Sequence, residues 1–487
     1  MVAPGNSRMD ARVTQIDRPI YVDLDGTLIA SDLLWESLFQ FARQDPLNLW
    51  KLPIWAAKGK AGMKAALARN LQFDAALLPY RPEVLAALAA EKAKGRRIVL
   101  ATASNERLAH AIADHLGIFD AVMASTDTVN LSAHRKLEAI RAHCGEGGYD
   151  YYGNSADDIC LFESAGEAIV VAPDRTASVW QKRSGAPLLP TAGSVLRGCL
   201  KVMRPHQWMK NVLIFVPLAL VHAFLDPAMM VAGILAFLSF SFAASSVYIV
   251  NDLLDLDADR RHKTKRNRPF ASGTVPIPLG LTLCAALFAA SVGFALLLPV
   301  EFLMVLGVYL VVTTAYSFAL KRMLLIDVLT LAALYTTRIV AGSAAVAAEA
   351  SFWLLAFSIF FFLSLALVKR FTELLDFGVG AHRSKTGRGY VDADLDTLAQ
   401  AGMASGFASV LVLALYIDSA DVRDLYAYPY LMWALCPLIL YIIVRIWILA
   451  RRGQMHEDPV VFILRDWRSQ IMIGLGALLF LAAAYVQ

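Results

Sequence analysis

The residues whose types and spacing best define a chemistry lie between Asn251 and Gly273, where the sequence reads NDLLDLDADRRHKTKRNRPFASG. Asn251, Asp255 and Asp259 repeat every four residues, so they share one face if the stretch begins as a helix. Oxygen-bearing side chains gathered in this way suit Mg²⁺ bridged to the phosphates of a substrate. The stretch also carries Asp252 and Asp257, and then the cations Lys265, Arg266 and Arg268. These cations would hold the remaining charge of a polyphosphate.

This Asp-rich stretch lies between two long apolar segments, 231–250 and 279–300, so we expect it at one face of a membrane. The chain has 487 residues, of which 57% are hydrophobic and 18% charged, which is too apolar for an ordinary soluble protein. A solvated loop that only sets the topology is the alternative interpretation. Four close carboxylates would contribute little to such a loop.

Apolar segments fill the chain from about residue 211 onward and predict about nine transmembrane helices. The expected spans are 211–225, 228–250, 277–299, 301–319, 324–346, 352–369, 400–417, 427–449 and 470–487. The connections after spans two, four, six and eight are rich in Lys and Arg, whereas those after spans three and five have none. Because cytoplasmic connections carry this excess, we expect the N-terminal half and the Asp-rich stretch in the cytoplasm and the C-terminus on the other side.

Polar side chains within apolar spans are costly, so each is a candidate for function. Tyr335 and Arg338 are three residues apart and would face one cavity. A paired structural role is the alternative for Arg338. Lys369 and Arg370 end the sixth span, where the alternative is that they reach the membrane surface.

The N-terminal part, about residues 15–190, alternates strand-like segments with helical patterns, which predicts a parallel α/β sheet. Ligands of such sheets lie at the carboxyl ends of the strands. Three strand-like segments, 19–22, 97–101 and 149–152, end in polar residues. These are Asp23, Asp25 and Thr27 after the first, Thr102 and Ser104 after the second, and Asn154, Asp157 and Asp158 after the third.

In their order along the chain, these segments resemble the motifs of the haloacid dehalogenase (HAD) superfamily of phosphotransferases. The resemblance implies that Asp23 attacks phosphorus and that Asp25 is the general acid and base. It also implies that Thr102, or less readily Ser104, bonds the phosphoryl oxygens and that Lys136 stabilises the charged intermediate.

The same resemblance implies a magnesium site formed by Asp23, Asp158 and the backbone carbonyl of Asp25. Asn154 stands where the family has an aspartate, a change that would weaken metal binding and could leave the phosphatase slow or inactive. The insert at about 32–82 would be a helical cap. Residues 191–210 would form a linker and an interface segment, followed by a membrane domain over 211–487.

The spacing N-D-x-x-D-x-x-x-D from Asn251 to Asp259 resembles the first Asp-rich motif of the UbiA superfamily of intramembrane prenyltransferases. The resemblance implies an all-α membrane bundle in which Asp252, Asp255 and Asp259 are catalytic and Asn251, Asp255 and Asp259 hold Mg²⁺. Such prenyltransferases carry a second Asp-rich motif. This sequence has only Asp327 in that region, followed by Tyr335-x-x-Arg338.

The segments RPHQWMKN, YTTRIVAG and LVKRFTEL are similar to those of the branch that includes decaprenyl-phosphate phosphoribosyltransferase. That similarity implies transfer of 5-phosphoribose from phosphoribosyl pyrophosphate (PRPP) to a polyprenyl (decaprenyl) phosphate. Lys265, Arg266 and Arg268 would bind the phosphates of the donor. The residues expected at the lipid phosphate are Lys210, Tyr335 and Arg338, and Lys369 and Arg370 would bind phosphate as well.

Together the two resemblances imply a bifunctional enzyme of the bacterial inner membrane, whose HAD domain removes the 5-phosphate to give polyprenyl-phosphoryl ribose. The alternative is a prenyltransferase with a prenyl diphosphate donor and an aromatic acceptor, whose HAD domain processes prenyl phosphates or is only regulatory. The first twenty residues are polar, so we expect no signal peptide. We expect no nucleic-acid partner, because the basic residues sit beside the membrane without interleaved aromatic residues. The sequence is compatible with an oligomer and does not fix the oligomeric state.

Overall fold

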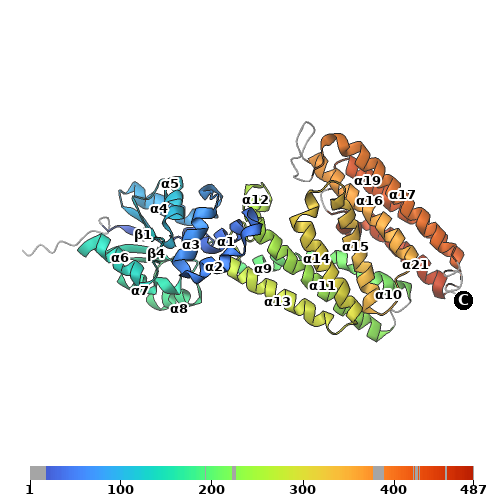
Figure 1. The fold of residues 1–487 in the computed structure, drawn as a ribbon, viewed down its shortest axis with the longest axis horizontal. Coiled ribbons are helices and arrows are strands. Elements are labelled where there is room, and N and C mark those ends of the chain that lie inside the picture. The colour runs from blue at the N-terminus through green and yellow to red at the C-terminus, as the bar shows by residue number, and fades with distance from the viewer. Residues whose placement is uncertain are drawn as a thin grey trace, which may run out of the picture. The chain divides into compact units, whose positions relative to one another are not determined.

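The computed structural model describes residues 18–485 except 192, 222–225, 377–388, 420–421, 423–425, 427 and 456–457. The first twenty residues and the predicted domain start at 15 therefore lie largely outside the described residues, as does part of the basic connection after the sixth expected span. The chain divides into two compact units (Figure 1). Unit 1 comprises the described residues up to Val202 together with Ile249–Leu283, and unit 2 comprises Met203–Tyr248 together with residues from Cys284 onward.

Unit 1 contains a six-stranded parallel sheet with strand order β3-β2-β1-β4-β5-β6, which confirms the predicted parallel α/β fold. Its strands are β1 Ile20–Val22, β2 Ile98–Asn105, β3 Ala121–Ser125, β4 Asp150–Gly153, β5 Ala168–Val171 and β6 Leu188–Leu189. In the centre, Ile20 of β1 pairs with Ile98 of β2 on one side and Asp150 of β4 on the other. The strands that precede the predicted site residues are thus neighbours, and their carboxyl ends meet at one edge.

Helices cover both faces of this sheet because successive side chains of a strand point to opposite faces. Ile20 and Val22 pack with residues of α4 and α5, whereas Tyr21 packs with residues of α6 and α7. The helices are α4 Pro82–Ala93, α5 Glu106–Leu116, α6 His134–Cys144, α7 Ile159–Ser164 and α8 Arg175–Ser184. Both faces are apolar, as expected of a parallel sheet that is covered on each side.

Three α-helices between β1 and α4 occupy the region of the expected cap. They are α1 Leu33–Gln44, α2 Lys51–Ala57 and α3 Gly59–Asn70. Asp32 caps α1, because its carboxylate accepts hydrogen bonds from the backbone N–H groups of Leu34 and Trp35. Unit 1 also contains the Asp-rich stretch, in which α12 spans Leu256–Arg261.

Unit 2 is helical. Its longer helices and the segments between them that bear on the site are the 3₁₀ helix η6 Pro205–Phe215, then α10 Val216–Leu220, α14 Val300–Phe318, α15 Ile326–Ala345, α16 Phe352–Asp376, α17 Leu395–Ile417, α19 Leu435–Arg451, α20 Pro459–Arg465 and α21 Trp467–Tyr485. Three further helices, α9 Val195–Met203, α11 Pro227–Leu254 and α13 Ile277–Ala295, contain residues of both units. The apolar core joins residues of α15, α16, α17 and α19, such as Ile339, Val368, Leu398 and Ile446.

Seven helices among the described residues are long and apolar enough to cross a membrane. They are Pro227–Leu254, Ile277–Ala295, Val300–Phe318, Ile326–Ala345, Phe352–Leu375, Asp392–Ile417 and Pro429–Arg451. The predicted count of nine is therefore not confirmed. The first expected span, 211–225, falls on η6 and the short α10, and the last corresponds to the shorter apolar helix Trp467–Ala483.

Candidate active sites

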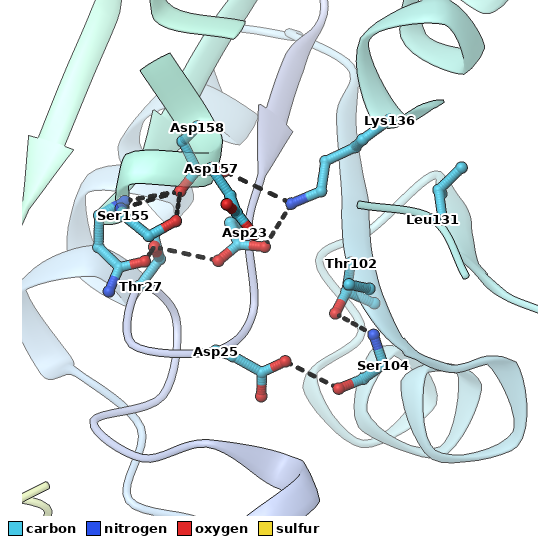
Figure 2. A network of polar contacts seen from close by, with 12 residues as sticks. Asp23, Asp25, Thr27, Thr102, Ser104, Leu131, Lys136, Ser155, Asp157 and Asp158 are labelled. Carbon is cyan, nitrogen blue, oxygen red and sulfur yellow. Dashed lines mark hydrogen bonds and ion pairs between the residues drawn. The ribbon is translucent and has the colours of Figure 1, made fainter. Parts of the chain in front are cut away.

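The first candidate site lies where β1 ends, at Asp23. This carboxylate is 6% exposed, and its Oδ1 accepts a hydrogen bond of 2.7 Å from Nζ of Lys136 on α6 (Figure 2). Burial raises the pKa of Asp23 to about 7, although Lys136 opposes this shift. Lys136 is itself 4% exposed and lies 3.6 Å from Oδ1 of Asp158. A buried carboxylate at a strand end, held by a buried ammonium, is suited to nucleophilic attack on phosphorus.

Asp158 follows β4 and is fixed by protein donors on both oxygens. Its Oδ1 accepts a hydrogen bond of 2.8 Å from Tyr151, and its Oδ2 accepts bonds from the N–H groups of Asn154 and Ser155 and from the Ser155 hydroxyl. Burial alone would raise the pKa of Asp158, but Lys136, Tyr151 and these N–H groups hold it below its usual range. Tyr151, whose hydroxyl also accepts from Lys136 at 3.1 Å, is a site residue that the sequence did not indicate.

Asp25 lies on the other side of Asp23 and faces the end of β2 (Figure 2). Its carboxylate accepts a bond of 2.7 Å from Leu33 N–H and one of 2.8 Å from the Ser104 hydroxyl. Burial raises the pKa of Asp25 to about 6, which brings it closer to neutral pH, as a group that both gives and takes a proton requires. Thr102 Oγ1 accepts a bond from the backbone N–H of Ser104, so the two hydroxyl residues form one turn beside Asp25.

Lys64 reaches this region from the cap helix α3, another residue that the sequence analysis missed. Its Nζ donates to the carbonyl of Ala103 at 2.6 Å and lies 3.4 Å from Oδ1 of Asn130. Together with Ser104 and Leu33, it lines a small pocket. No motif marks a cap lysine, because the cap is packed against the strand ends only in the folded chain.

The oxygen atoms near Asp23 fit a magnesium ion. Both oxygens of Asp158 are already occupied by protein donors, whereas Oδ1 of Asn154 and Oδ2 of Asp23 lie 3.3 and 3.5 Å from the same Thr27 hydroxyl. Gly26 has φ of +79°, and a Cβ there would lie 2.1 Å from Asn154 Nδ2, so the loop holds the amide closely. Asp23 and Asn154 would hold Mg²⁺ through hard oxygen ligands. Within the described part of the chain, no three His, Cys, Asp or Glu side chains form a metal site by themselves.

The raised pKa of Asp23 predicts that magnesium binding depends on pH. Below about pH 7 the carboxyl is protonated and must lose its proton to bind the ion, so the metal competes with protons. The Mg²⁺ concentration that gives half-maximal phosphate release should fall by about fivefold from pH 6 to pH 7, by about tenfold from pH 6 to pH 8, and level off above pH 8. Magnesium titrations of the full chain at these pH values measure this. The same half-maximal concentration at pH 6 and pH 8 would contradict the prediction.

The Asp-rich stretch in unit 1 differs from one continuous helix. Helix α11 ends at Leu254, and Asp255 is the N-cap of α12, although the N–H groups of Asp255 and Asp259 still bond to carbonyls four residues earlier. Arg268 Nη1 joins Asp252 and Asp259, at 3.0 and 2.7 Å. The pair that the structure brings together is therefore Asp252 with Asp259.

Asp255 and its neighbours lie beside helix α1 within the same unit. Arg43 Nη2 is 3.4 Å from Oδ1 of Asp255, and Asp257 accepts a bond of 3.0 Å from the amide of Gln40. Lys265 and Arg266 are exposed and lie in a short 3₁₀ helix that precedes Arg268. Asn251 is partly buried at the end of α11.

Unit 2 contains a second cluster, centred on Asp458, the N-cap of α20. Its Oδ2 accepts bonds of 2.7 Å from Lys210 and 3.1 Å from Lys369, and the Tyr335 hydroxyl donates to the same carboxylate at 2.9 Å. The four residues come from η6, α15, α16 and the segment before α20. Three of them were predicted to bind phosphate, and Asp458 was not singled out by the sequence.

Arg338 extends this cluster. Its guanidinium lies 5.3 Å from the ring centroid of Tyr309 and 5.7 Å from that of Tyr335, within the range of cation–π contacts. Nε donates to Oδ1 of Asn211 at 2.8 Å, and Nη1 donates to the carbonyl of Leu334. Within the described residues Arg338 forms no ion pair with a carboxylate, so its charge is not balanced locally.

Arg370, also predicted to bind phosphate, is instead enclosed by protein acceptors. Its guanidinium donates to Asp327 at 2.5 Å, to the Tyr316 hydroxyl at 2.9 Å and to Glu373. Arg370 is 1% exposed and Asp327 is fully buried, and Tyr390 donates a second bond to Asp327. These contacts favour a structural role for both residues.

Asp327→Asn should therefore destabilise the chain without touching the Asp458 cluster. Removing one partner of a buried ion pair costs about 3–5 kcal/mol, because the other charge stays buried. We expect a lower melting temperature of the detergent-purified chain. Asp396→Asn is the matched control, since its side chain is 90% exposed and its cation is 3.9 Å away. Equal melting temperatures for the two variants would refute the structural role.

Comparison with known families assigns both parts of the chain. The sequence model of the UbiA prenyltransferase family matches residues 212–465, and that of the haloacid dehalogenase-like hydrolases matches residues 20–163. The chain belongs to the UbiA prenyltransferase family and carries a HAD-like domain at its N-terminus. The two families are a transferase and a hydrolase family, so the chain is an enzyme, and its apolar helices indicate an integral membrane protein.

Two relatives and one solved structure are similar to this chain over different shares of its length. The chain is 38% identical over 471 residues, 96% of its length and 91% of the relative's, to the uncharacterized protein y4nM of Sinorhizobium fredii. It is 38% identical over 182 residues, 37% of its length and 55% of the relative's, to the decaprenyl-phosphate phosphoribosyltransferase of Corynebacterium glutamicum. A UbiA homolog from Archaeoglobus fulgidus, solved with GPP and Mg²⁺, is 17% identical with a TM-score of 0.45, covering 59% of this chain and 99% of that one.

Proposed function

We propose that this chain transfers 5-phosphoribose from PRPP to a polyprenyl phosphate and then removes the 5-phosphate with its HAD domain. The product would be polyprenyl-phosphoryl ribose. The partial similarity to decaprenyl-phosphate phosphoribosyltransferase supports the first step, and the HAD family match supports the second. Joining both activities in one chain raises the effective concentration of the intermediate at the second site.

The observation that carries the transfer step is the gathering of Lys210, Lys369 and Arg338 with Tyr335 in unit 2. Three buried or half-buried cations near one point form a site for a phosphate group, because burial strengthens charge-assisted hydrogen bonds. We assign this cluster to the phosphate of the acceptor lipid. The Asp-rich stretch and its cations Lys265, Arg266 and Arg268 would hold PRPP.

In the transfer, an oxygen of the lipid phosphate forms a bond to the anomeric carbon of ribose while the bond from that carbon to pyrophosphate breaks. The lipid phosphate is already ionised, so no base is needed. Lys210 and Arg338 would orient it, while the hydroxyl of Tyr335 holds Asp458 beside them. Mg²⁺ at the Asp-rich stretch would supply the charge that makes pyrophosphate a good leaving group.

In the second step, Asp23 attacks the phosphorus of the 5-phosphate and Asp25 gives its proton to the departing ribose oxygen. Water then cleaves the phosphoaspartate, with Asp25 as the base. Lys136 stabilises the negative charge on Asp23 and on the transferred group. Thr102 would bind a phosphoryl oxygen, while Ser104 holds Asp25.

We place these sites at the cytoplasmic face of a bacterial inner membrane, with the C-terminus in the periplasm, on the basis of the cation-rich connections. The domain limits at about 15–190, 191–210 and 211–487 belong to this proposal.

The decisive experiment incubates the purified full chain with Mg²⁺, ribose-labelled PRPP and decaprenyl phosphate, and resolves the lipids by mass. A labelled ribosyl lipid without the 5-phosphate supports both steps. A labelled lipid that keeps the 5-phosphate would support the transfer step and contradict the dephosphorylation step. No labelled lipid would overturn the proposal, and a parallel reaction with a prenyl diphosphate and an aromatic acceptor tests the alternative.

A further inference from the structure

The cluster in unit 2 contains an acid that phosphate binding does not require. Asp458 lies among three cations, and its side chain is 7% exposed. Burial alone would raise the pKa of Asp458, but Lys369 and Lys210 hold it well below its usual range, so the carboxylate is ionised at neutral pH. Its presence in a site for an anionic group needs a reason, since it repels the ligand.

Charge balance supplies that reason. Lys210, Lys369 and Arg338 carry three positive charges, and Asp458 carries one negative charge, which leaves a net charge of two. Burial lowers the pKa of Lys210 to about 8, so this lysine is still protonated at pH 7. A phosphate monoester carries about two negative charges near neutral pH and would balance the cluster.

Resting on the proposed function, we propose that Asp458 makes the acceptor site selective for a lipid phosphate monoester over a lipid diphosphate. It does so by removing one unit of positive charge from the cluster. A diphosphate headgroup carries roughly one further negative charge, about three in total. Three cations alone would balance it, but the cluster that includes Asp458 has a net charge of only +2. The residue is thus a specificity determinant that acts through Lys210 and Lys369 rather than a catalytic residue.

The two lysines have N–H donors left for a second anion. Each ammonium has three N–H donors, and each donates one to Asp458. Tyr335 is the neutral donor that keeps Asp458 in place, through bonds of 2.9 and 3.0 Å to its two oxygens. The nearby ion cluster of Arg370, Asp327 and Glu373 is satisfied through separate contacts.

Binding of decaprenyl phosphate and decaprenyl diphosphate to the full chain in detergent, without PRPP, tests the inference. Competition against labelled decaprenyl phosphate at pH 7 gives the ratio of the two affinities. The variants are Asp458→Asn, Lys369→Gln and the double variant that carries both. Asp396→Asn is the control, because it makes the same chemical change at an exposed residue.

We expect the wild type to prefer the monophosphate and Asp458→Asn to shift the ratio toward the diphosphate by roughly tenfold. Lys369→Gln should shift it the other way. The double variant restores the net charge and should return the ratio to that of the wild type. If Asp458→Asn does not fold, the comparison of the wild type, Lys369→Gln and the double variant decides the question.

A wild type that prefers the diphosphate, or a double variant whose ratio equals that of Lys369→Gln, would overturn the inference. A shift in Asp396→Asn as large as that in Asp458→Asn would also overturn it, because the effect would then be a general one of charge. Failure of the proposed function is distinguishable: the chain would then bind the monophosphate selectively but form no ribosyl lipid with PRPP.

Discussion

Asp23→Asn should stop the two-step reaction at the 5-phosphoribosyl lipid, with phosphate release reduced by roughly 10³-fold or more. The amide is not nucleophilic, so no phosphoaspartate forms, and the other groups of the site do not replace that step. Formation of the phosphoribosyl lipid should continue at the wild-type rate, because the transferase assignment involves none of the residues around Asp23. The lipids are resolved by mass over a time course, and free phosphate is measured in parallel.

Asp157→Asn is the matched control, since Asp157 lies in the same loop as Asp158 but is exposed. It should release phosphate at the wild-type rate. Asp23→Asn leaves Lys136 buried with Asp158 at 3.6 Å, so melting temperatures must show that both variants are folded. If a folded Asp23→Asn variant still gave fully dephosphorylated lipid, Asp23 would not be the nucleophile. The 5-phosphate would then be removed at another site of this chain or by another protein.

The arrangement at Asp23 could be predicted because sequence order and topology agree there. Polar residues followed three strand-like segments, and a parallel sheet gathers the carboxyl ends of neighbouring strands. Tyr151 was not predictable in the same way. It lies inside β4, where the sequence pattern predicts an ordinary core residue. Its hydroxyl contacts Lys136 and Asp158, which are distant from it or carry no signal of this contact in the sequence.

Asp458 shows a second limit of sequence patterns. It lies 248 residues from Lys210 and 89 from Lys369, and nothing in its local sequence distinguishes it from a helix N-cap, which it also is. Asp458 lies in a connection between two apolar segments, and the sequence does not say which cation it contacts. Arg370 illustrates the converse. Its place at the end of a span suggested a phosphate-binding cation, but its guanidinium donates to Asp327 and Tyr316 instead.

The Asp-rich stretch was predicted as a face of three oxygen ligands, and its local geometry changes that grouping. The four-residue repeat assumes an unbroken helix, whereas Asp255 begins a new helical segment and turns toward Arg43. Asp252 and Asp259 are then the two carboxylates that Arg268 holds together. The repeat in the sequence contains no signal for the break, because no Gly or Pro interrupts it.

The second large effect is expected for Asp259→Asn, which should reduce ribosyl transfer by roughly 10² to 10³-fold while phosphate release from a soluble phosphate monoester continues. Asp259 is 3% exposed, and burial raises its pKa, whereas Arg268 opposes this shift. The amide is a poorer ligand and leaves Arg268 with one carboxylate instead of two. Initial rates at several Mg²⁺ concentrations separate weaker metal binding from a slower chemical step.

Asp257→Asn is the control within the same short helix, because Asp257 bonds to the neutral amide of Gln40 and not to Arg268. If Asp252 and Asp259 form the metal-binding pair, this variant should transfer ribose at a rate within about threefold of the wild type. Equal losses in the two variants would mean that the stretch acts through its total charge rather than through one pair. A loss confined to Asp259→Asn, reversed in part by high Mg²⁺, would separate a defined pair of ligands from a diffuse acidic surface.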